Sequence, residues 1–466
     1  MVFSSIPFLY YFLPAVVLAY IAAPRFLKNT VLLLFSLVFY AWGEPRYVFL
    51  MIATVLVNYL LGILIEKFKG KALSKLFMGL SLAFSLGFLA YFKYADFFIE
   101  NFNRATGLSF KLLNIALPIG ISFYTFQILS YTIDVYRGIV SAQKNPVTLA
   151  TYIALFPQLI AGPIVRYIDV ERELVSRTHS FEKTATGIRR FIFGLSKKVL
   201  LANTLGELCE AFLMSGEKSV LFYWLFVLAY MLQVYFDFSG YSDMAIGLGK
   251  IFGFKFLENF DYPFISRSIT EFWRRWHMSL GSWFRDYVYI PMGGNRVKRG
   301  RLFINVFTVW FLTGFWHGAE WNFIVWGLYF GVLLTLEKLS LRKYIEKSGA
   351  LGHIYLLFFV AISFAIFSAP TLSDAIGYVG GMFGAGGIPV YSASFFYNLR
   401  NFGFVLIISA VAATPLPKLA AIKLQKSPRI CTAIRIAEVP LLVVLLILAT
   451  AYLADGAFNP FLYFRF

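Results

Sequence analysis

Residues 312–327 read Leu-Thr-Gly-Phe-Trp-His-Gly-Ala-Glu-Trp-Asn-Phe-Ile-Val-Trp-Gly. They lie within Phe303–Leu336, an apolar run long enough for one membrane span plus a turn or for two short inserted helices. The run contains His317, one of only four histidines in the chain. An ionisable side chain in a membrane segment costs free energy, so it is a candidate for function, and imidazole moves protons near neutral pH. His317 is therefore a candidate catalytic residue; the alternative is a core histidine that is hydrogen-bonded between helices.

The composition of the whole chain is typical of a polytopic membrane protein. Of its 466 residues, 59% are hydrophobic and only 14% are charged, whereas soluble domains carry about 25% charged residues. At about 20 residues per span, the length accommodates roughly ten to thirteen spans plus loops. The first apolar run continues to Ala23 with no basic segment before it, which favours a retained span over a cleaved signal peptide.

Two further apolar segments are broken by proline and glycine. Segment 113–136 is interrupted by Pro118 and Gly120, and segment 147–165 is interrupted by Pro157, Gly162 and Pro163. Broken helices are tolerated at membrane depth where they line a cavity or lie buried in protein. We therefore expect an all-α, polytopic transmembrane helical bundle, in which some helices are short, broken or interfacial around a buried polar cavity.

The net charge of +18 arises from Lys and Arg residues in short loops between apolar runs. This is the positive-inside pattern of membrane proteins, so we do not expect nucleic-acid binding. Clusters at Lys67–Lys75 and Lys418–Arg435 predict that these two loops face the cytoplasm, and counting spans back places Arg25 and Lys28 there too. Gly43–Pro45 is then an outer turn.

No sequence motif predicts a metal or a tightly bound cofactor. The two cysteines, Cys209 and Cys431, are far apart and have no metal or redox spacing. A nucleotide P-loop, a metalloprotease motif and a GxSxG elbow are also absent from the sequence. The chemistry must therefore use few groups, and one base with two bound substrates is sufficient for acyl transfer.

The stretch Ser266–Pro291 is too polar to face lipid, so it should lie at the interface or line a polar cavity. It contains His277 and three arginines, Arg274, Arg275 and Arg285. If the stretch is helical, Arg274 and His277 share one face at i, i+3. The arginines are candidate binding residues for the phosphates of a donor, because guanidinium matches phosphate geometry; the alternative is that they anchor the segment to lipid headgroups.

Two weaker polar features follow apolar runs. Asp237, Ser239 and Asp243 interrupt the end of the run that begins at Val220. They could orient an imidazole, or they could cap a helix and pair with a neighbouring Arg, which are the commoner uses. The turn Gly293–Arg296 could offer backbone N–H groups to a phosphate or simply reverse the chain.

Together, these segments resemble the membrane-bound O-acyltransferase family, and in particular its bacterial branch that contains the membrane subunit of alginate O-acetyltransferase. Each piece is modest alone, but their order along nearly the whole chain is specific. The pieces are Pro118-Ile-Gly-Ile-Ser-Phe-Tyr-Thr-Phe126, Phe156-Pro-Gln-Leu-Ile-Ala-Gly-Pro163, Tyr235-Phe-Asp-Phe-Ser-Gly-Tyr-Ser-Asp243, Phe272-Trp-Arg-Arg-Trp-His277, Asp286–Pro291 with Gly293–Arg296, Trp316-His-Gly318 and the tail Asn459–Phe466.

The resemblance implies that His317 is the catalytic histidine and His277 the second polar residue of a site buried in the membrane and reached from both faces. It implies that an acyl thioester enters from the cytoplasm, with acetyl-CoA as the donor substrate and no bound cofactor. It also implies a bacterial cytoplasmic membrane location, and an extracytoplasmic partner protein that completes acetyl transfer to a polysaccharide such as alginate. Glu320 has no role in the family pattern; it could interact with His317 at i, i+3 or point away.

The expected organisation is one polytopic domain over residues 1–466, with N-terminal spans in 1–112, a catalytic core in 113–336 and C-terminal spans in 337–466. Two alternative functions stay open. The first is D-alanyl or other acyl transfer to a cell-wall polymer, because the teichoic acid D-alanyl branch shares both tryptophan–histidine pairs. The second is a transporter or channel, in which broken helices and an intramembrane histidine line a path, although transporters often show paired repeats and none is visible here.

Overall fold

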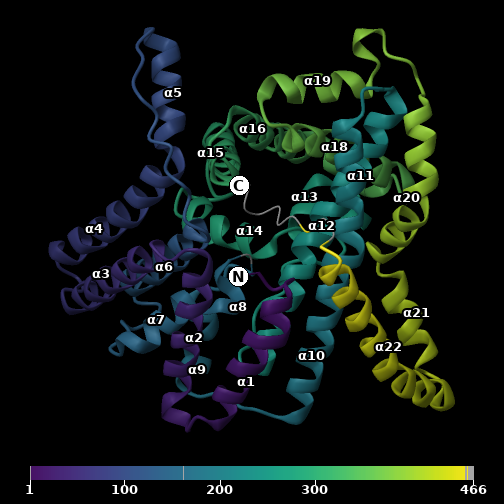
Figure 1. Ribbon diagram of the computed structural model, residues 1–466. Coiled ribbons are helices and arrows are strands. Elements are labelled where there is room, and N and C mark those ends of the chain that lie inside the picture. The colour runs from purple at the N-terminus through teal and green to yellow at the C-terminus, as the bar shows by residue number, and fades with distance from the viewer. Residues whose placement is uncertain (1, 161, 457–458, 460–466) are drawn as a thin grey trace. The chain divides into compact units, whose positions relative to one another are not determined.

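The computed structural model describes residues 2–160, 162–456 and 459 (Figure 1). In these ranges the regular structure is helical, with no strand, which confirms the all-α class. The tail piece Asn459–Phe466 lies outside the described residues except for Asn459.

The chain divides into two compact units. One consists of Met1–Phe191 with Ser242–Leu257, and the other of Ile192–Tyr241 with Glu258–Phe466. The predicted subdivision of a single domain into a core and flanking spans stays a prediction.

The helices differ widely in length, and short 3-10 and π segments join several of them. In the first part of the chain they are η1 (Phe8–Phe12), α1 (Leu13–Ala22), η2 (Arg25–Leu27), α2 (Lys28–Gly43), α3 (Tyr47–Lys67), α4 (Ala72–Leu89), η3 (Ala90–Tyr94), α5 (Ala95–Thr106), α6 (Ile121–Arg137), α7 (Pro146–Ala154), α8 (Phe156–Leu159), α9 (Tyr167–Val175) and α10 (Phe181–Ser196). They continue as η4 (Lys197–Ala202), α11 (Asn203–Met214), α12 (Val220–Ile251), η5 (Pro263–Ile265), α13 (Ile269–Arg275), α14 (Met278–Phe284), η6 (Arg285–Tyr289), α15 (Arg299–His317), α16 (Trp321–Leu336), η7 (Glu337–Leu341), α17 (Arg342–Lys347), α18 (Ala350–Ser368), α19 (Leu372–Met382), η8 (Ala385–Gly387), α20 (Ala393–Ala412), α21 (Leu416–Leu424) and α22 (Pro428–Ala454).

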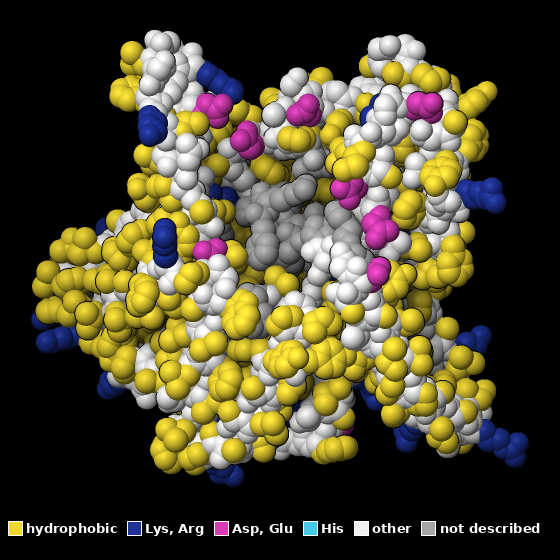
Figure 2. Space-filling model, viewed as in Figure 1, with side chains coloured by type: hydrophobic (Ala, Val, Ile, Leu, Met, Phe, Trp, Pro, Cys, Tyr) yellow, Lys and Arg dark blue, Asp and Glu magenta, His cyan; other side chains and the backbone are white. Residues whose placement is uncertain are grey.

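Among the described residues, eight helices are long and apolar enough to cross a membrane. They are Arg25–Gly43, Tyr47–Lys67, Ala72–Thr106, Val220–Ile251, Trp321–Leu339, Ala350–Ser368, Ala393–Ala412 and Pro428–Ala454. Their outer side chains are apolar, as on α22, where Ile436 is 69% exposed and Val439 64% exposed. Figure 2 shows hydrophobic side chains over much of the face in view. Because so much exposed apolar surface requires lipid around it, the chain is a multi-pass membrane protein.

The apolar run Phe303–Leu336 forms two helices, α15 and α16. Of the two forms predicted from the sequence, one span plus a turn or two helices, it takes the second. A Cβ atom at Gly314 would lie 2.3 Å from the carbonyl oxygen of Phe323, and one at Gly327 would lie 2.3 Å from the carbonyl oxygen of Trp310. Glycine therefore lets the two backbones approach closely, as small residues do between membrane helices. This packing fixes the end of α15.

The broken segment 113–136 is helical only in its second part. α6 begins directly after Gly120, whose φ of 76° lies in the left-handed region that favours glycine. A Cβ atom at Gly120 would also lie 2.8 Å from the carbonyl oxygen of Leu159. The chain thus enters α6 through a close backbone contact that a larger residue would prevent.

The expected helix end near Asp237 and Asp243 is wrong, because both lie inside the continuous helix α12 and cap nothing. Asp237 forms an ion pair with Lys198 at 2.5 Å. Asp243 pairs with Arg190 at 2.8 Å, which is the arginine pairing considered as an alternative. Since each carboxylate has a cationic partner, the helix continues past both to Ile251.

Candidate active site

His317 is the last residue of α15, and its side chain is only 8% exposed. The next residue, Gly318, is extended, and a Cβ atom there would lie 2.2 Å from the ring of Phe323. Glycine therefore allows the chain to turn at once into α16. The C-terminal end of a helix carries partial negative charge, so the His317 imidazole lies at that negative end.

His277 lies between α13 and α14 with a φ of 45°, which is uncommon for a residue other than glycine. Its Nδ1 is 3.3 Å from Oδ1 of Asn259. The same oxygen accepts hydrogen bonds from the Ser279 N–H at 3.2 Å and the Ser279 hydroxyl at 2.9 Å. Because Asn259 Oδ1 is an acceptor, His277 donates through Nδ1 and keeps the lone pair on Nε2.

Burial determines the charge state of His277. His277 lies outside the candidate spanning helices, and burial lowers its pKa to about 3. An imidazole with that pKa is neutral near pH 7 and is a weak base. His277 is therefore suited to orienting a group by hydrogen bonding.

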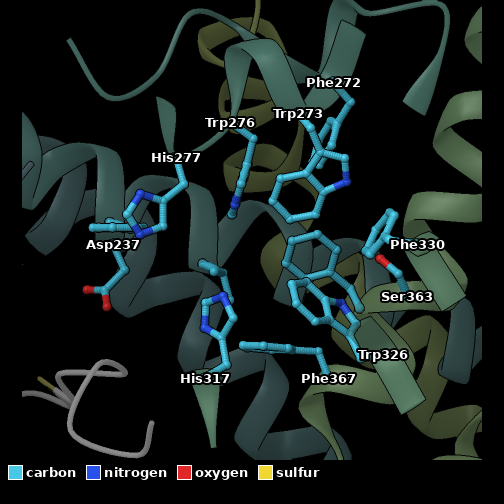
Figure 3. A pocket seen from close by; sticks show the side chains of 13 residues that line it. Asp237, Phe272, Trp273, Trp276, His277, His317, Trp326, Phe330, Ser363 and Phe367 are labelled. Atoms are coloured by element: carbon cyan, nitrogen blue, oxygen red, sulfur yellow. The ribbon is translucent and has the colours of Figure 1, made fainter. Parts of the chain in front are cut away.

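Both histidines line one cavity of about 40 Å³ (Figure 3). The Trp316 ring lies beside both, with its centroid 6.2 Å from that of His277 and 5.0 Å from that of His317. Trp326 and Phe367 pack on His317 with centroid distances of 5.1 Å and 5.4 Å. The cavity is thus narrow and mostly apolar, with room for a small group, since liquid water occupies about 30 Å³ per molecule.

Asp237 also lines this cavity, but Figure 3 shows its carboxylate directed away from the two imidazoles. Its partner Lys198 lies on η4, and both side chains are almost fully buried. A buried carboxylate needs such a partner, because an uncompensated buried charge is strongly destabilising. The ion pair with Lys198 therefore leaves no uncompensated carboxylate charge at the cavity wall.

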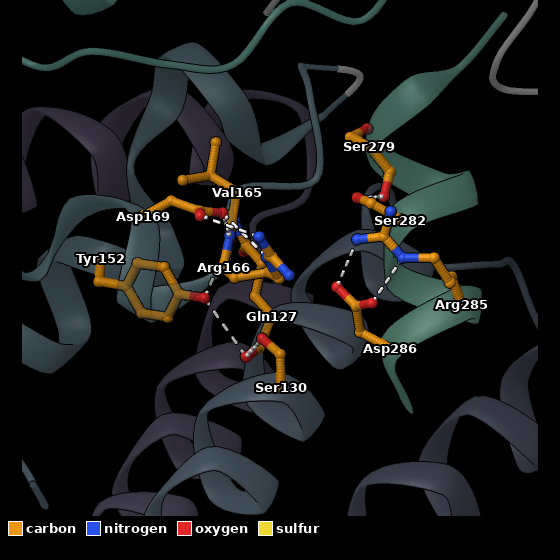
Figure 4. Close-up of polar contacts among 10 residues, drawn as sticks. All are labelled: Gln127, Ser130, Tyr152, Val165, Arg166, Asp169, Ser279, Ser282, Arg285 and Asp286. Carbon is orange, nitrogen blue, oxygen red and sulfur yellow. Dashed lines mark hydrogen bonds and ion pairs between the residues drawn. The ribbon is translucent and has the colours of Figure 1, made fainter. Parts of the chain in front are cut away.

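A second cavity, of about 300 Å³, is lined by Arg274, Arg285 and Lys338. Figure 4 shows Arg285 in a two-point contact with Asp286, with Nε to Oδ1 at 2.7 Å and Nη2 to Oδ2 at 3.0 Å. The cavity therefore has an excess of positive charge that suits an anion. Trp310 lines it and packs at 4.6 Å on Trp273, which lines the histidine cavity, so this tryptophan pair lies between the two cavities.

The third predicted arginine lies elsewhere, and the shared helical face of Arg274 and His277 is not formed. Arg275 pairs with Asp261 at 2.8 Å and with Glu271 at 3.1 Å, and it does not line either cavity. Arg274 and His277 do not share a helical face, because α13 ends at Arg275.

Glu320 is not at a helical i, i+3 position from His317, because α15 ends at His317. Glu320 is the exposed N-cap residue of α16, with an extended φ of −140°. It therefore cannot reach His317 through the helical geometry that the sequence spacing allowed.

Three polar residues escaped sequence reasoning: Lys338, which lines the second cavity, and Asn259 and Lys198, which contact residues of the histidine cavity. Asn259 contacts His277 and Lys198 contacts Asp237, and no spacing rule connects either residue to its partner. In the sequence, a lysine at the end of an apolar helix, such as Lys338, indicates which side of the membrane that end faces. It does not indicate a binding site.

Comparison with known proteins identifies the family of the chain. A model of the membrane-bound O-acyltransferase family matches residues 140–373, which include both cavity histidines. A probable alginate O-acetylase of Pseudomonas putida is 37% identical over the full length of both chains. One of Pseudomonas aeruginosa is 43% identical over 80% of this chain and 73% of its own. A peptidoglycan O-acetyltransferase of Helicobacter pylori is 33% identical over 87% of this chain and 85% of its own.

Proposed function

The chain belongs to the membrane-bound O-acyltransferase family, and from that premise we propose that it transfers an acetyl group from a cytoplasmic thioester to the hydroxyl groups of an extracytoplasmic polysaccharide such as alginate. The observation that carries this proposal is the meeting of His317 and His277 in one narrow, buried cavity. The names of the relatives support the reaction class and a polysaccharide acceptor.

In the proposed reaction, His317 takes the proton from the acceptor hydroxyl as its oxygen attacks the thioester carbonyl carbon. The carbon–sulfur bond breaks, and the proton passes to the leaving thiolate. An ester and a free thiol result. His277 orients the acceptor or the carbonyl oxygen through its fixed imidazole.

Acetyl-CoA is the proposed donor, as a substrate and not as a bound cofactor. The cationic cavity lined by Arg274, Arg285 and Lys338 would hold its phosphates, while the thioester passes the Trp273–Trp310 pair toward the histidines. The small apolar histidine cavity favours acetyl over D-alanyl, because the carboxylate that lines it, Asp237, is already paired with a lysine and is not available for a D-alanyl ammonium group.

The proposed location is the cytoplasmic membrane of a bacterium, where an acceptor made outside the cell must meet a donor from inside. We propose that an extracytoplasmic protein takes part in the last transfer to the polymer. Identifying the proteins that co-purify with the chain tests this part.

The main experiment uses proteoliposomes supplied with acetyl-CoA labelled in the acetyl group, with alginate oligosaccharides and with the extracytoplasmic protein that co-purifies with the chain. The His317→Ala variant should lose acetyl transfer by about 10²- to 10⁴-fold per folded molecule, the range of general acid–base catalysis. The His277→Ala variant should lose less. The same assay with a D-alanyl thioester distinguishes the two acyl groups. The wild-type protein should incorporate acetyl groups and no D-alanyl groups.

The matched control is His353→Ala, because His353 is half-buried, hydrogen-bonds through Nδ1 to the Ser266 carbonyl oxygen at 3.0 Å and lines neither cavity. It should keep near wild-type turnover. If His317→Ala also keeps that turnover while folded and inserted, the mechanism is wrong.

A further inference from the structure

A cluster of positive charge surrounds Tyr20 in the first unit, far along the chain from both histidines of the active site. Nζ of Lys28 lies 4.4 Å from the centre of the Tyr20 ring, and Cζ of Arg177 lies 5.7 Å from it. The Tyr20 hydroxyl donates to the Phe252 carbonyl oxygen at 2.9 Å and lies 2.9 Å from Nε2 of His179. Three basic side chains from two distant segments thus meet at one aromatic ring.

Arg177 is held in place and is not a freely moving surface arginine. Its guanidinium lies 4.6 Å from the centre of the Phe254 ring, and its Nη2 donates to Oδ1 of Asn29. Asn29 is fixed in turn, because its Nδ2 donates to the Leu174 carbonyl oxygen at 2.9 Å. The other terminal nitrogen, Nη1, is buried and has no hydrogen-bond partner. A buried charged donor without a partner costs free energy until an acceptor binds it.

No acidic side chain balances this cluster. Within the part of the chain that the structure describes, no carboxylate pairs with Lys28, Arg177 or Lys183. Asp169, on the helix that precedes Arg177, forms an ion pair with Arg166 at 3.1 Å (Figure 4). Burial, and then the charges of these same cations, lower the pKa of His179. The cluster therefore has positive charge and a preformed donor, but no internal acceptor.

We propose that Arg177 and Lys28 bind a phosphate group, with Lys183 adding positive charge around it and the His179 ring holding Tyr20 in place beside it. A guanidinium nitrogen that is already oriented matches a phosphate oxygen, and an ammonium beside it adds a second charged contact. The loop that carries Lys28 is predicted to face the cytoplasm, so the phosphate belongs either to an anionic phospholipid of that leaflet or to a soluble phosphate compound. This site is independent of the proposed acetyl transfer.

Two thermal-shift experiments test the site and identify the source of the phosphate. In the first, the protein is placed in nanodiscs of phosphatidylglycerol or of phosphatidylcholine, and the difference in Tm is measured. In the second, delipidated protein in detergent is titrated with inorganic phosphate, and Kd is obtained from the same thermal shift. A response to phosphatidylglycerol alone assigns the site to a lipid headgroup, and a response to inorganic phosphate assigns it to soluble phosphate.

The Arg177→Gln and Lys28→Gln variants should each lose most of the ligand-induced shift, with Kd raised at least about tenfold, as expected for a lost charge-assisted hydrogen bond. The shift is compared and not the Tm itself, so a variant that is less stable because of the lost Phe254 contact stays informative. Lys75→Gln is the matched control, because Lys75 is exposed in the first turn of α4, in another stretch that is predicted to face the cytoplasm. The proposal is overturned if both variants respond like the wild type, or if Lys75→Gln loses the response equally.

Discussion

Asn259 is the residue on which the orientation of His277 most directly depends. In the Asn259→Ala variant, His277 loses the acceptor for its Nδ1 proton, so the ring can rotate and change tautomer. We expect kcat for acetyl transfer to fall by about 10- to 100-fold with little change in the donor KM, the range seen for groups that orient a functional histidine at metal sites. The matched control is Ser279→Ala, which removes another hydrogen bond to the same oxygen. If kcat falls equally in both variants, Asn259 stabilises the loop around His277 and does not specifically orient its imidazole.

At this scale the sequence allowed the two histidines to be predicted, but not the groups that orient them. His317 and His277 stand out because an imidazole in apolar surroundings is rare, and because each follows a tryptophan in a motif of the resembled family. Asn259 lies in a loop without periodicity, where an amide is usually a solvated turn residue. Its role depends on a fold that brings it against the left-handed turn at His277.

Two neighbouring arginines of the short helix α13 have different surroundings, although both are candidates for donor binding on sequence alone. Arg274 lines the cationic cavity, whereas Arg275 is neutralised by Asp261 and Glu271. The Arg274→Gln variant should therefore raise the KM for acetyl-CoA by about tenfold, the value of one charge-assisted contact. Arg275→Gln, its matched control, should leave KM near that of the wild type. Steady-state kinetics with the donor varied decides this, and a raised KM in both variants would contradict the assignment of the cavity.

Helix boundaries were predictable where glycine or proline sets them, and not where a distant partner does. The start of α6 follows from Pro118 and Gly120, which are visible in the sequence. The continuation of α12 past Asp237 and Asp243 depends on cations contributed by other helices. A carboxylate in an apolar run looks like a helix end when its partner is unknown, because an unpaired buried charge is too costly to keep.

For the whole molecule, composition was sufficient to predict a polytopic helical membrane protein, and it was less reliable for the number of spans. The predicted ten to thirteen exceeds the eight helices of the described residues that are long and apolar enough. The difference lies in helices such as α6, with 17 residues, and α15, which begins with Arg299 and Arg301. A helix that packs against other helices around a cavity can be shorter or more polar than one surrounded by lipid, so apolar length alone does not count it.

The sidedness of the molecule can be tested with a cysteine that the chain already has. Cys431 lies in the first turn of α22, inside the basic loop Lys418–Arg435, and is partly exposed, whereas Cys209 is buried. Moving so many cations across the membrane is unfavourable, so the loop should stay in the cytoplasm. In a Cys209→Ser background, a membrane-impermeant maleimide should leave Cys431 unlabelled in intact cells and label it after permeabilisation. A Pro45→Cys variant that also lacks Cys431 should be labelled from outside, because Pro45 is exposed in the predicted outer turn. Strong labelling of Cys431 in intact cells would reverse the topology, and with it the side from which the donor must enter.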